Sequence, residues 1–207
     1  MPTAAAPAPS EPPAAPGREE QILEAALRVF AERGFKAATI KRIAQEAGLK
    51  SPALLYWYFP NKEAMFGAVL SRFGTVLGQV PDDLPDIDTP PEQLLPELLS
   101  RVLARFEDPR TLQVYRVLLL EIPLMQAAGF NLRAERPINL FAFLEDYFAR
   151  QVELGRLRPH DPREAARSVV ALISFNVQSR SSGILEPPGP DDEWVAFVTR
   201  LLIDGLS

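Results

Sequence analysis

Apolar residues recur at helical spacing along almost the whole chain. Between residues 18 and 33 they follow the i, i+3, i+4, i+7 pattern that predicts one amphipathic helix. Glu19 and Glu20 begin this segment and Gly34 follows it, as is typical of a helix start and a helix stop. No segment alternates apolar and polar residues between hairpin turns. The pattern therefore predicts an all-α protein.

Cap and stop residues divide the next part of the chain into shorter helices. Each segment begins with a side-chain oxygen that suits an N-cap, and a glycine or proline follows the first two of them. The expected helices cover residues 39–47, about 51–58, and 61–79.

A Pro- and Asp-rich segment over residues 80–93 indicates a loop or a domain boundary. Beyond it the helical pattern continues, and the expected helices cover about 91–107, 109–127, 133–154, 162–183 and 190–205. Residues 1–17 are rich in Pro and Ala, which predicts a disordered tail. We thus expect about nine helices, arranged as a three-helix domain over residues 18–62 and a larger helical domain over residues 63–207.

Composition narrows the possible classes of function. The 207 residues include no cysteine, which excludes disulfides, thiolate metal sites and cysteine nucleophiles. A single histidine makes a Ser-His-Asp triad or a multi-histidine metal site hard to build. No apolar run approaches the ~20 residues of a membrane helix, and the start of the chain lacks a secretory pattern. We expect a cytoplasmic protein with no membrane contact, no metal and no cofactor.

Charge is distributed unevenly along the chain. The net charge is −5, yet residues 18–62 carry eight basic and five acidic side chains. All four lysines lie between residues 36 and 62. A basic segment on an acidic protein indicates a local contact with a polyanion. A merely solvated face is the other interpretation of the same charges.

The helices expected over residues 39–47 and 51–58 have the layout of a helix-turn-helix. In that arrangement the second helix enters the major groove and presents its first side chains to base edges. The run Tyr56-Trp57-Tyr58-Phe59 occupies every face of its short helix, so some of these rings must be exposed or at an interface. A tyrosine can donate its hydroxyl to a phosphate while its ring packs on the scaffold.

The chain resembles the TetR family of one-component transcriptional regulators over about residues 20–70. The resemblance rests on the string AATIKRIAQEAGLKSPALLYWYFPNKEAMF and on the preceding ILEAALRVFAERGFKAAT. It implies a ligand-responsive repressor that binds double-stranded DNA as a homodimer and leaves a roughly palindromic operator when an effector binds. Beyond this segment the chain agrees with the family in its helix count.

The resemblance also implies DNA-contact roles for particular residues. Thr39 would cap its helix and bond a phosphate, while Tyr56 and Lys62 would contact phosphates. Trp57 occupies a position that reaches bases or backbone. Residues 50–53 would form the groove-facing start of the recognition helix. The expected DNA contacts are Thr39, Lys41, Lys50, Ser51, Pro52, Ala53, Tyr56, Trp57 and Lys62.

Two features depart from the family pattern. Gly48 and Tyr56 are eight positions apart, one more than in many members, so the register of residues 50–53 stays open. Leu54 replaces the small or hydroxylated residue that usually precedes the Leu-Tyr pair. Both departures favour the alternative interpretation, a helical small-molecule-binding protein that has lost DNA binding.

The C-terminal helices combine many aromatic residues with isolated polar ones, which is typical of a small-molecule site. The resemblance implies an effector pocket here, and the composition favours a lipophilic molecule. For each aromatic residue, ordinary core packing is the other interpretation. The expected lining residues are Phe106, Tyr115, Arg116, Phe141, Phe175 and Asn176.

The last two helices are apolar on more than one face, whereas a surface helix needs only one buried stripe. The second stripe predicts a partner, and we expect a two-fold homodimer through residues 162–183 and 190–205. The carboxylates of this domain occur without a base, a metal triad or a glycine-rich phosphate loop, so we expect no enzyme activity.

Overall fold

The structure is a computed structural model that describes residues 17–127, 139–182 and 191–206. Within these ranges the chain forms nine α-helices and short 3₁₀ segments, without a strand, as the sequence predicted. None of the described helices is both long and apolar enough to cross a membrane. The first sixteen residues of the expected tail, and the beginning of the helix expected over 133–154, lie outside the described residues.

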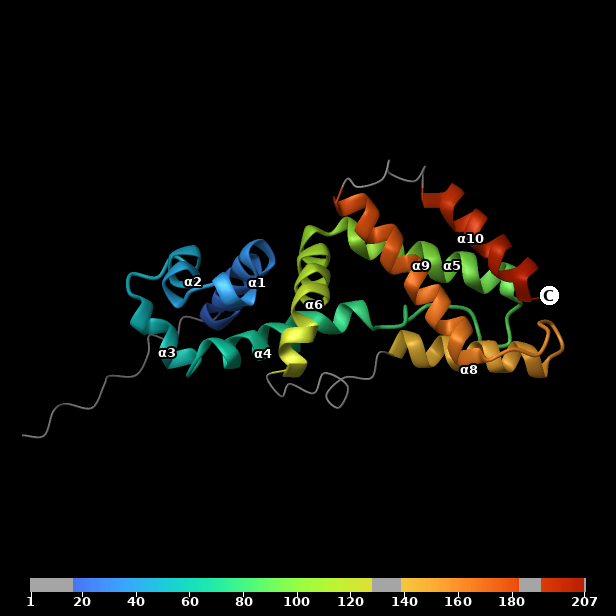
Figure 1. The fold of residues 1–207 in the computed structure, drawn as a ribbon, viewed down its shortest axis with the longest axis horizontal. Helices are drawn as coiled ribbons and strands as arrows, with labels where there is room; N and C mark the ends of the chain where they lie inside the picture. The colour runs from blue at the N-terminus through green and yellow to red at the C-terminus, as the bar shows by residue number, and fades with distance from the viewer. Residues whose placement is uncertain (1–16, 128–138, 183–190, 207) are drawn as a thin grey trace, which may run out of the picture.

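The N-terminal domain occupies one end of the molecule (Figure 1). Its elements are α1 (Arg18–Ala37), α2 (Ile40–Glu46), the 3₁₀-helix η1 (Pro52–Leu54), α3 (Leu55–Tyr58) and α4 (Lys62–Phe73). Helix α1 breaks at Gly34, which has φ 74°, a left-handed conformation that favours glycine. The helix stop expected at this glycine is therefore confirmed as a sharp break in α1.

Side-chain caps begin three of these helices, at positions that the sequence indicated. The Thr39 hydroxyl accepts a hydrogen bond from the Arg42 backbone N–H at 3.2 Å. Asn61 Oδ1 accepts one from the Ala64 N–H at 2.7 Å, and Ser51 Oγ caps η1. Each cap satisfies an N–H group that has no partner within its own helix.

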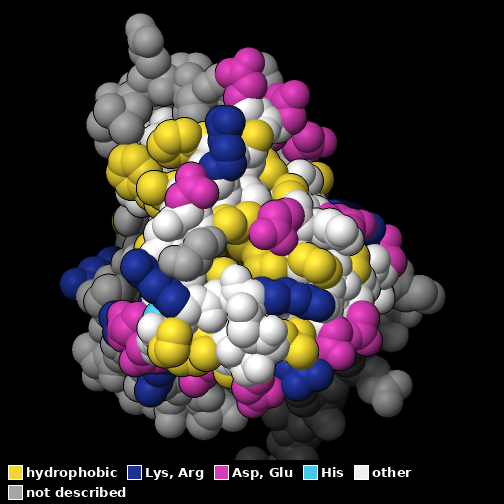
Figure 2. Space-filling view, turned by 90° about the vertical axis from the view of Figure 1, so that its right-hand side faces the viewer, with side chains coloured by type: hydrophobic (Ala, Val, Ile, Leu, Met, Phe, Trp, Pro, Cys, Tyr) yellow, Lys and Arg dark blue, Asp and Glu magenta, His cyan; other side chains and the backbone are white. Residues whose placement is uncertain are grey.

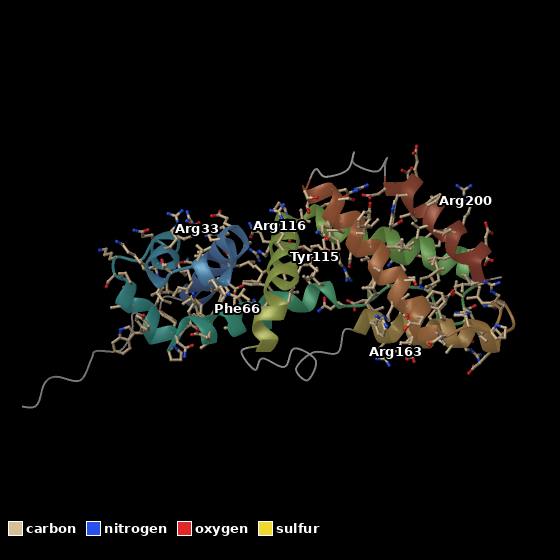
Figure 3. All side chains as sticks on the ribbon, viewed as in Figure 1. Arg33, Phe66, Tyr115, Arg116, Arg163 and Arg200 are labelled. Atoms are coloured by element: carbon tan, nitrogen blue, oxygen red, sulfur yellow. The ribbon has the colours of Figure 1, made fainter. Side chains whose placement is uncertain are left out.

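Helix α4 is part of the N-terminal core, which changes the expected domain boundary at residues 62–63. Met65, Phe66 and Val69 of α4 are buried in the same cluster as Phe30 of α1. The Phe66 ring meets the Phe30 ring edge to face, with centroids 4.9 Å apart. Figure 3 shows Phe66 among the helices of this domain. The helix that leaves the helix-turn-helix is thus packed against it.

The C-terminal domain consists of α5 (Pro91–Ala104), α6 (Pro109–Ala127), α8 (Asn139–Glu153), α9 (Pro162–Ser182) and α10 (Asp191–Leu206). Helix α5 ends three residues earlier than expected, because the chain tightens into a 3₁₀ turn over Arg105–Glu107. The core of this domain combines leucines of α5, Tyr147 and Phe148 of α8, and small or branched apolar residues of α9 and α10.

Helix α6 belongs to both hydrophobic cores (Figure 1). Val114 and Val117 are buried in the N-terminal core, whereas Tyr115 is buried in the C-terminal core. The Tyr115 hydroxyl donates to the Ser174 carbonyl oxygen of α9 at 2.8 Å, and Figure 3 shows its ring on the side of α6 that faces this domain. One helix therefore contacts the apolar interiors of both domains.

An ion pair reinforces the junction between the domains, and another joins two helices on the N-terminal side of it. Arg110 of α6 pairs with Glu24 of α1 at 2.6 Å, and its guanidinium carbon lies 5.6 Å from the centroid of the Phe73 ring. Arg72 of α4 pairs with Glu20 of α1 at 2.9 Å. Arg110, Arg72, Glu20 and Phe73 line a cavity of about 280 Å³ with both polar and apolar walls. The start of α6 is thus tied to both α1 and α4.

Candidate nucleic-acid interface

The recognition segment, residues 50–58, presents two aromatic side chains outward from a buried anchor. Leu55 and Phe59 are buried in the N-terminal core. Tyr56 is 56% exposed and Trp57 is 42% exposed, while Tyr58 is half-buried against the core. The aromatic run therefore divides between the core and solvent, and Tyr56 and Trp57 are its outward members.

The first turn of the recognition segment is a 3₁₀ turn that follows a left-handed glycine. Gly48 adopts φ 65°, which turns the chain out of α2, and the segment then starts as η1 rather than as an α-helix. In this register Pro52 and Ala53 are exposed, and Ser51 is half-buried. Ser51 Oγ accepts the Ala53 N–H at 3.3 Å. Pro52 and Ala53 thus form the outer surface of the first turn.

Exposed cations flank this segment in the chain. Lys36, Lys41, Arg42 and Lys50 are exposed, and none of them forms an ion pair with a carboxylate of the described residues. The nearby Arg28 differs, because it pairs with Glu46 at 3.0 Å. The four cations are thus available to an external polyanion.

Two exposed hydroxyl groups supplement these charges. The Thr39 oxygen accepts a backbone hydrogen bond as an N-cap, and its own proton remains available as a donor. The Tyr56 hydroxyl belongs to an exposed side chain. Hydroxyl donors of this kind suit phosphate oxygens.

The ammonium group of Lys62, an expected phosphate contact, is directed into the protein. Its Nζ donates to the carbonyl oxygens of Phe35 at 2.7 Å, Ala38 at 3.0 Å and Lys36 at 3.4 Å. It also lies 4.4 Å from the centroid of the Phe35 ring. An ammonium has three N–H groups, and all three have backbone partners here. A phosphate contact would require one of these bonds to break.

Among the expected effector residues, Phe106 and Tyr115 lie together. Phe106 lines a cavity of about 240 Å³ with Leu103, Leu112 and Val177, and three charged residues also line it. The Tyr115 ring meets the Phe106 ring edge to face at 5.4 Å. Burial raises the pKa of the Tyr115 hydroxyl above its ordinary value.

The other four expected lining residues are more dispersed. Asn176 is only 2% exposed, and its amide oxygen and nitrogen have no hydrogen-bond partner among the described residues. Phe141 is half-buried against the C-terminal core, and the exposed Arg116 donates to the Ser181 carbonyl oxygen at 3.4 Å. Phe175 is 62% exposed on α9. It was expected in the pocket, but it lies on the outer face, because a helix with two apolar faces buries only one of them in its own domain.

Sequence reasoning missed a further buried polar side chain, on α10. Thr199 is buried, its hydroxyl has no partner among the described residues, and it lines a cavity of about 440 Å³ between α5 and α10. Threonine is common on amphipathic helices, so the sequence carried no signal for it. Within the described residues, no group of His, Cys, Asp and Glu side chains is placed to hold a metal ion.

Comparison with known proteins connects this geometry to a class of regulators. A model of the bacterial regulatory proteins of the tetR family matches residues 22–69. A model of the C-terminal domain of AefR-like transcriptional repressors matches residues 93–201. The helix-turn-helix exposes aromatic residues and cations that have no described carboxylate partner. Together with the two family matches, this geometry identifies the class of the protein, which is a helix-turn-helix transcriptional regulator.

Individual relatives identify the family of regulators to which the chain belongs. The HTH-type transcriptional regulator RutR of Escherichia coli K12 is 44% identical over 198 residues, which cover 91% of this chain and 90% of RutR. The uncharacterized HTH-type transcriptional regulator YerO of Bacillus subtilis is 33% identical over 108 residues. That match spans 50% of this chain but only 35% of YerO. The chain belongs to the TetR family of transcriptional regulators.

A solved structure supports the fold independently. A TetR family transcriptional regulator from Pseudomonas syringae pv. tomato has a TM-score of 0.70, with 91% of this chain and 96% of that chain covered. Its sequence identity of 23% makes this a likeness of fold alone. Members of the family bind operator DNA and small-molecule effectors and are typically dimeric. None of these three relatives supports the alternative of a carrier protein without DNA binding.

Proposed function

We propose that the protein is a homodimeric repressor that acts in the cytoplasm and leaves a roughly palindromic operator when a lipophilic effector binds. One observation carries the proposal: Tyr56 and Trp57 are exposed on a short helix whose Leu55 is buried. A side chain held this way is presented to a duplex at little cost in conformational entropy. The basic surroundings of the helix supply sequence-independent attraction to phosphates.

The proposed interface divides its residues between two tasks. Thr39 and Tyr56 donate hydroxyl protons to phosphates, and Lys41 and Lys50 supply positive charge. The groove-facing residues are Ser51, Pro52, Ala53 and Trp57. Lys62 acts indirectly in this proposal, because its three bonds to α1 position the start of α4.

The proposed dimer is supported by large apolar side chains that are exposed on the last two helices. Phe175 of α9 and Phe197 and Leu201 of α10 are each more than half exposed. Figure 2 shows hydrophobic side chains interrupting the charged surface at the end of the molecule that carries α10. A two-fold axis through α9 and α10 pairs this surface with itself and gives two recognition segments, which require a palindromic site.

The proposed effector site includes Phe106, Tyr115 and the C-terminal core behind them. A cavity of about 240 Å³ lined mainly by carbon suits a small lipophilic molecule. Phe141, Arg116 and the unpartnered amide of Asn176 are proposed as further contacts. An effector that displaces Tyr115 would move α6, and Val114 would transmit the shift to the N-terminal core. A coupling of about 1–3 kcal/mol is typical of such regulation.

A gel-shift experiment with DNA from upstream of the protein's own gene tests the proposal. We expect sequence-specific binding whose affinity falls steeply as salt is raised. Tyr56→Phe should weaken binding about threefold to tenfold through the loss of one phosphate hydrogen bond. Tyr58→Phe is the matched control, because Tyr58, two positions further along, is half-buried against the N-terminal core. An affinity that depends on neither salt nor sequence would contradict the proposal.

A further inference from the structure

The first turn of the recognition segment has an outer surface made of carbon atoms. Pro52 and Ala53 are exposed, and neither side chain has a hydrogen-bonding group. Ser51, which precedes them, is half-buried, and its hydroxyl oxygen accepts the Ala53 N–H at 3.3 Å. Trp57, one turn further on, adds an aromatic surface that is 42% exposed. This part of the interface therefore offers mainly van der Waals contact.

Such a surface distinguishes bases in a particular way. In the major groove every base edge carries hydrogen-bond donors or acceptors, and thymine alone among the four bases also carries a methyl group, at C5. A carbon surface placed against a polar edge removes water without replacing its hydrogen bonds, which is unfavourable. Placed against a methyl group, the same surface buries apolar area on both sides, which is favourable.

The charged residues around the segment do not supply this discrimination. Lys41, Arg42 and Lys50 are exposed cations without a partner among the described carboxylates. Cations of this kind bind phosphates or the acceptor atoms of guanine, and neither contact reads a methyl group. Recognition of a thymine methyl group in the first turn therefore depends on Pro52, Ala53 and the nearby indole.

We infer that Pro52 and Ala53, with Trp57 beside them, recognise thymine C5-methyl groups in each half-site of the operator. The inference rests on the proposed function, because it assigns the chemistry of the bases that the recognition segment reads. It makes Pro52 and Ala53 determinants of specificity, although neither side chain can form a hydrogen bond.

Replacement of single thymines by deoxyuridine tests the inference directly. The full-length protein first selects its preferred duplex from a random-sequence library. Each thymine of that duplex is then replaced in turn by deoxyuridine, which pairs identically and lacks only the methyl group. At fixed salt we expect Kd to rise about threefold to fivefold at one or two positions of each half-site, as burial of one methyl group predicts. Kd should be unchanged at the other thymines.

Protein variants then assign the methyl contact to its residues. In Ala53→Gly and in Pro52→Ala the contacting carbon is removed, so the thymine and deoxyuridine duplexes should bind within about 1.5-fold of each other at the affected position. The two substitutions act on different atoms, so either variant suffices if the other is poorly folded. Tyr56→Phe is the control, because loss of a phosphate contact should weaken binding to both duplexes equally.

Each outcome separates this inference from the proposed function. Sequence-specific binding that tolerates deoxyuridine at every half-site position overturns the thymine inference and leaves the repressor proposal intact. A deoxyuridine effect that persists in full in both variants overturns the assignment to Pro52 and Ala53. Selection of no preferred duplex at all contradicts the proposed function itself.

Discussion

Lys62 and Phe35 are joined by two different contacts, although they are 27 positions apart in the chain. The Lys62 ammonium donates to the Phe35 carbonyl oxygen at 2.7 Å, and it lies 4.4 Å from the centroid of the Phe35 ring. The contacts connect the first residue of α4 to the last turn of α1. Because α2 and α3 lie between these two points in the chain, the pair fixes both ends of the helix-turn-helix.

This arrangement predicts that Lys62→Met destabilises the fold and does not remove a phosphate contact. The free energy of unfolding in urea should fall by about 1–3 kcal/mol, because half-buried carbonyl oxygens lose a charged donor. DNA affinity should fall, but the slope of log K against log salt should stay the same. A lost phosphate contact would make that slope shallower by about 0.9.

Lys41→Met is the matched control for this experiment. Lys41 is exposed and has no described carboxylate partner, so its substitution should leave stability unchanged and make the salt slope shallower. If Lys62→Met instead behaves like Lys41→Met, then Lys62 contacts DNA directly and its bonds to α1 are secondary.

Features that depend on neighbouring residues were predictable from the sequence. A cap or a stop requires only the right side chain at the right position, so Gly34, Thr39 and Asn61 end or begin helices where the pattern placed them. The all-α fold follows from the same local periodicity. The outward position of Tyr56 was predictable in kind, because four successive aromatic residues cannot all be buried on one short helix.

Features that depend on distant segments were not predictable. The inward direction of Lys62 depends on backbone carbonyl groups at the end of α1, and no spacing rule reveals those. Phe175 was expected in a pocket, yet a helix that is apolar on two faces does not show which face its own domain covers. The shared position of α6 in both cores likewise depends on three-dimensional packing.

The exposed apolar residues of the last two helices predict how the dimer can be broken. Phe175→Glu should raise the dimer dissociation constant by at least about 100-fold, because it places a charge in a surface that we propose is buried. Sedimentation velocity measures the change. The monomer should remain folded, since Phe175 is 62% exposed within its own chain. Arg33→Glu, an exposed position of the N-terminal domain (Figure 3), should leave the dimer intact; equal dissociation in both variants would place the interface elsewhere.

The buried amide of Asn176 predicts an unusual response to substitution. Its oxygen and nitrogen have no described partner, and an unsatisfied buried polar group costs about 1–3 kcal/mol. Asn176→Leu should therefore leave stability toward urea unchanged or increase it, while weakening the response of DNA binding to the effector.

Gln151 provides the comparison for Asn176. It is also fully buried, but its side-chain N–H donates to the Ile87 carbonyl oxygen at 2.9 Å. Gln151→Leu should therefore destabilise the protein by about 1–3 kcal/mol. Equal destabilisation by the two substitutions would show that the Asn176 amide already has hydrogen-bond partners in the folded protein. It would then not be available to bind a ligand.

The buried phenol of Tyr147 predicts a loss of stability at alkaline pH. Burial, with a contribution from the nearby Glu92 carboxylate, holds the pKa of Tyr147 well above its ordinary value near 10. Above about pH 10 the unfolded chain releases the phenol proton while the folded chain retains it. The free energy of unfolding therefore falls by about 1.4 kcal/mol per pH unit because of this group.

Tyr147→Phe should lose about 1 kcal/mol of stability at pH 7, because the hydroxyl donates to the Thr89 carbonyl oxygen at 2.9 Å. Urea unfolding between pH 8 and 11 should then show a shallower decline in the variant, and an unchanged slope would contradict a raised pKa for this phenol.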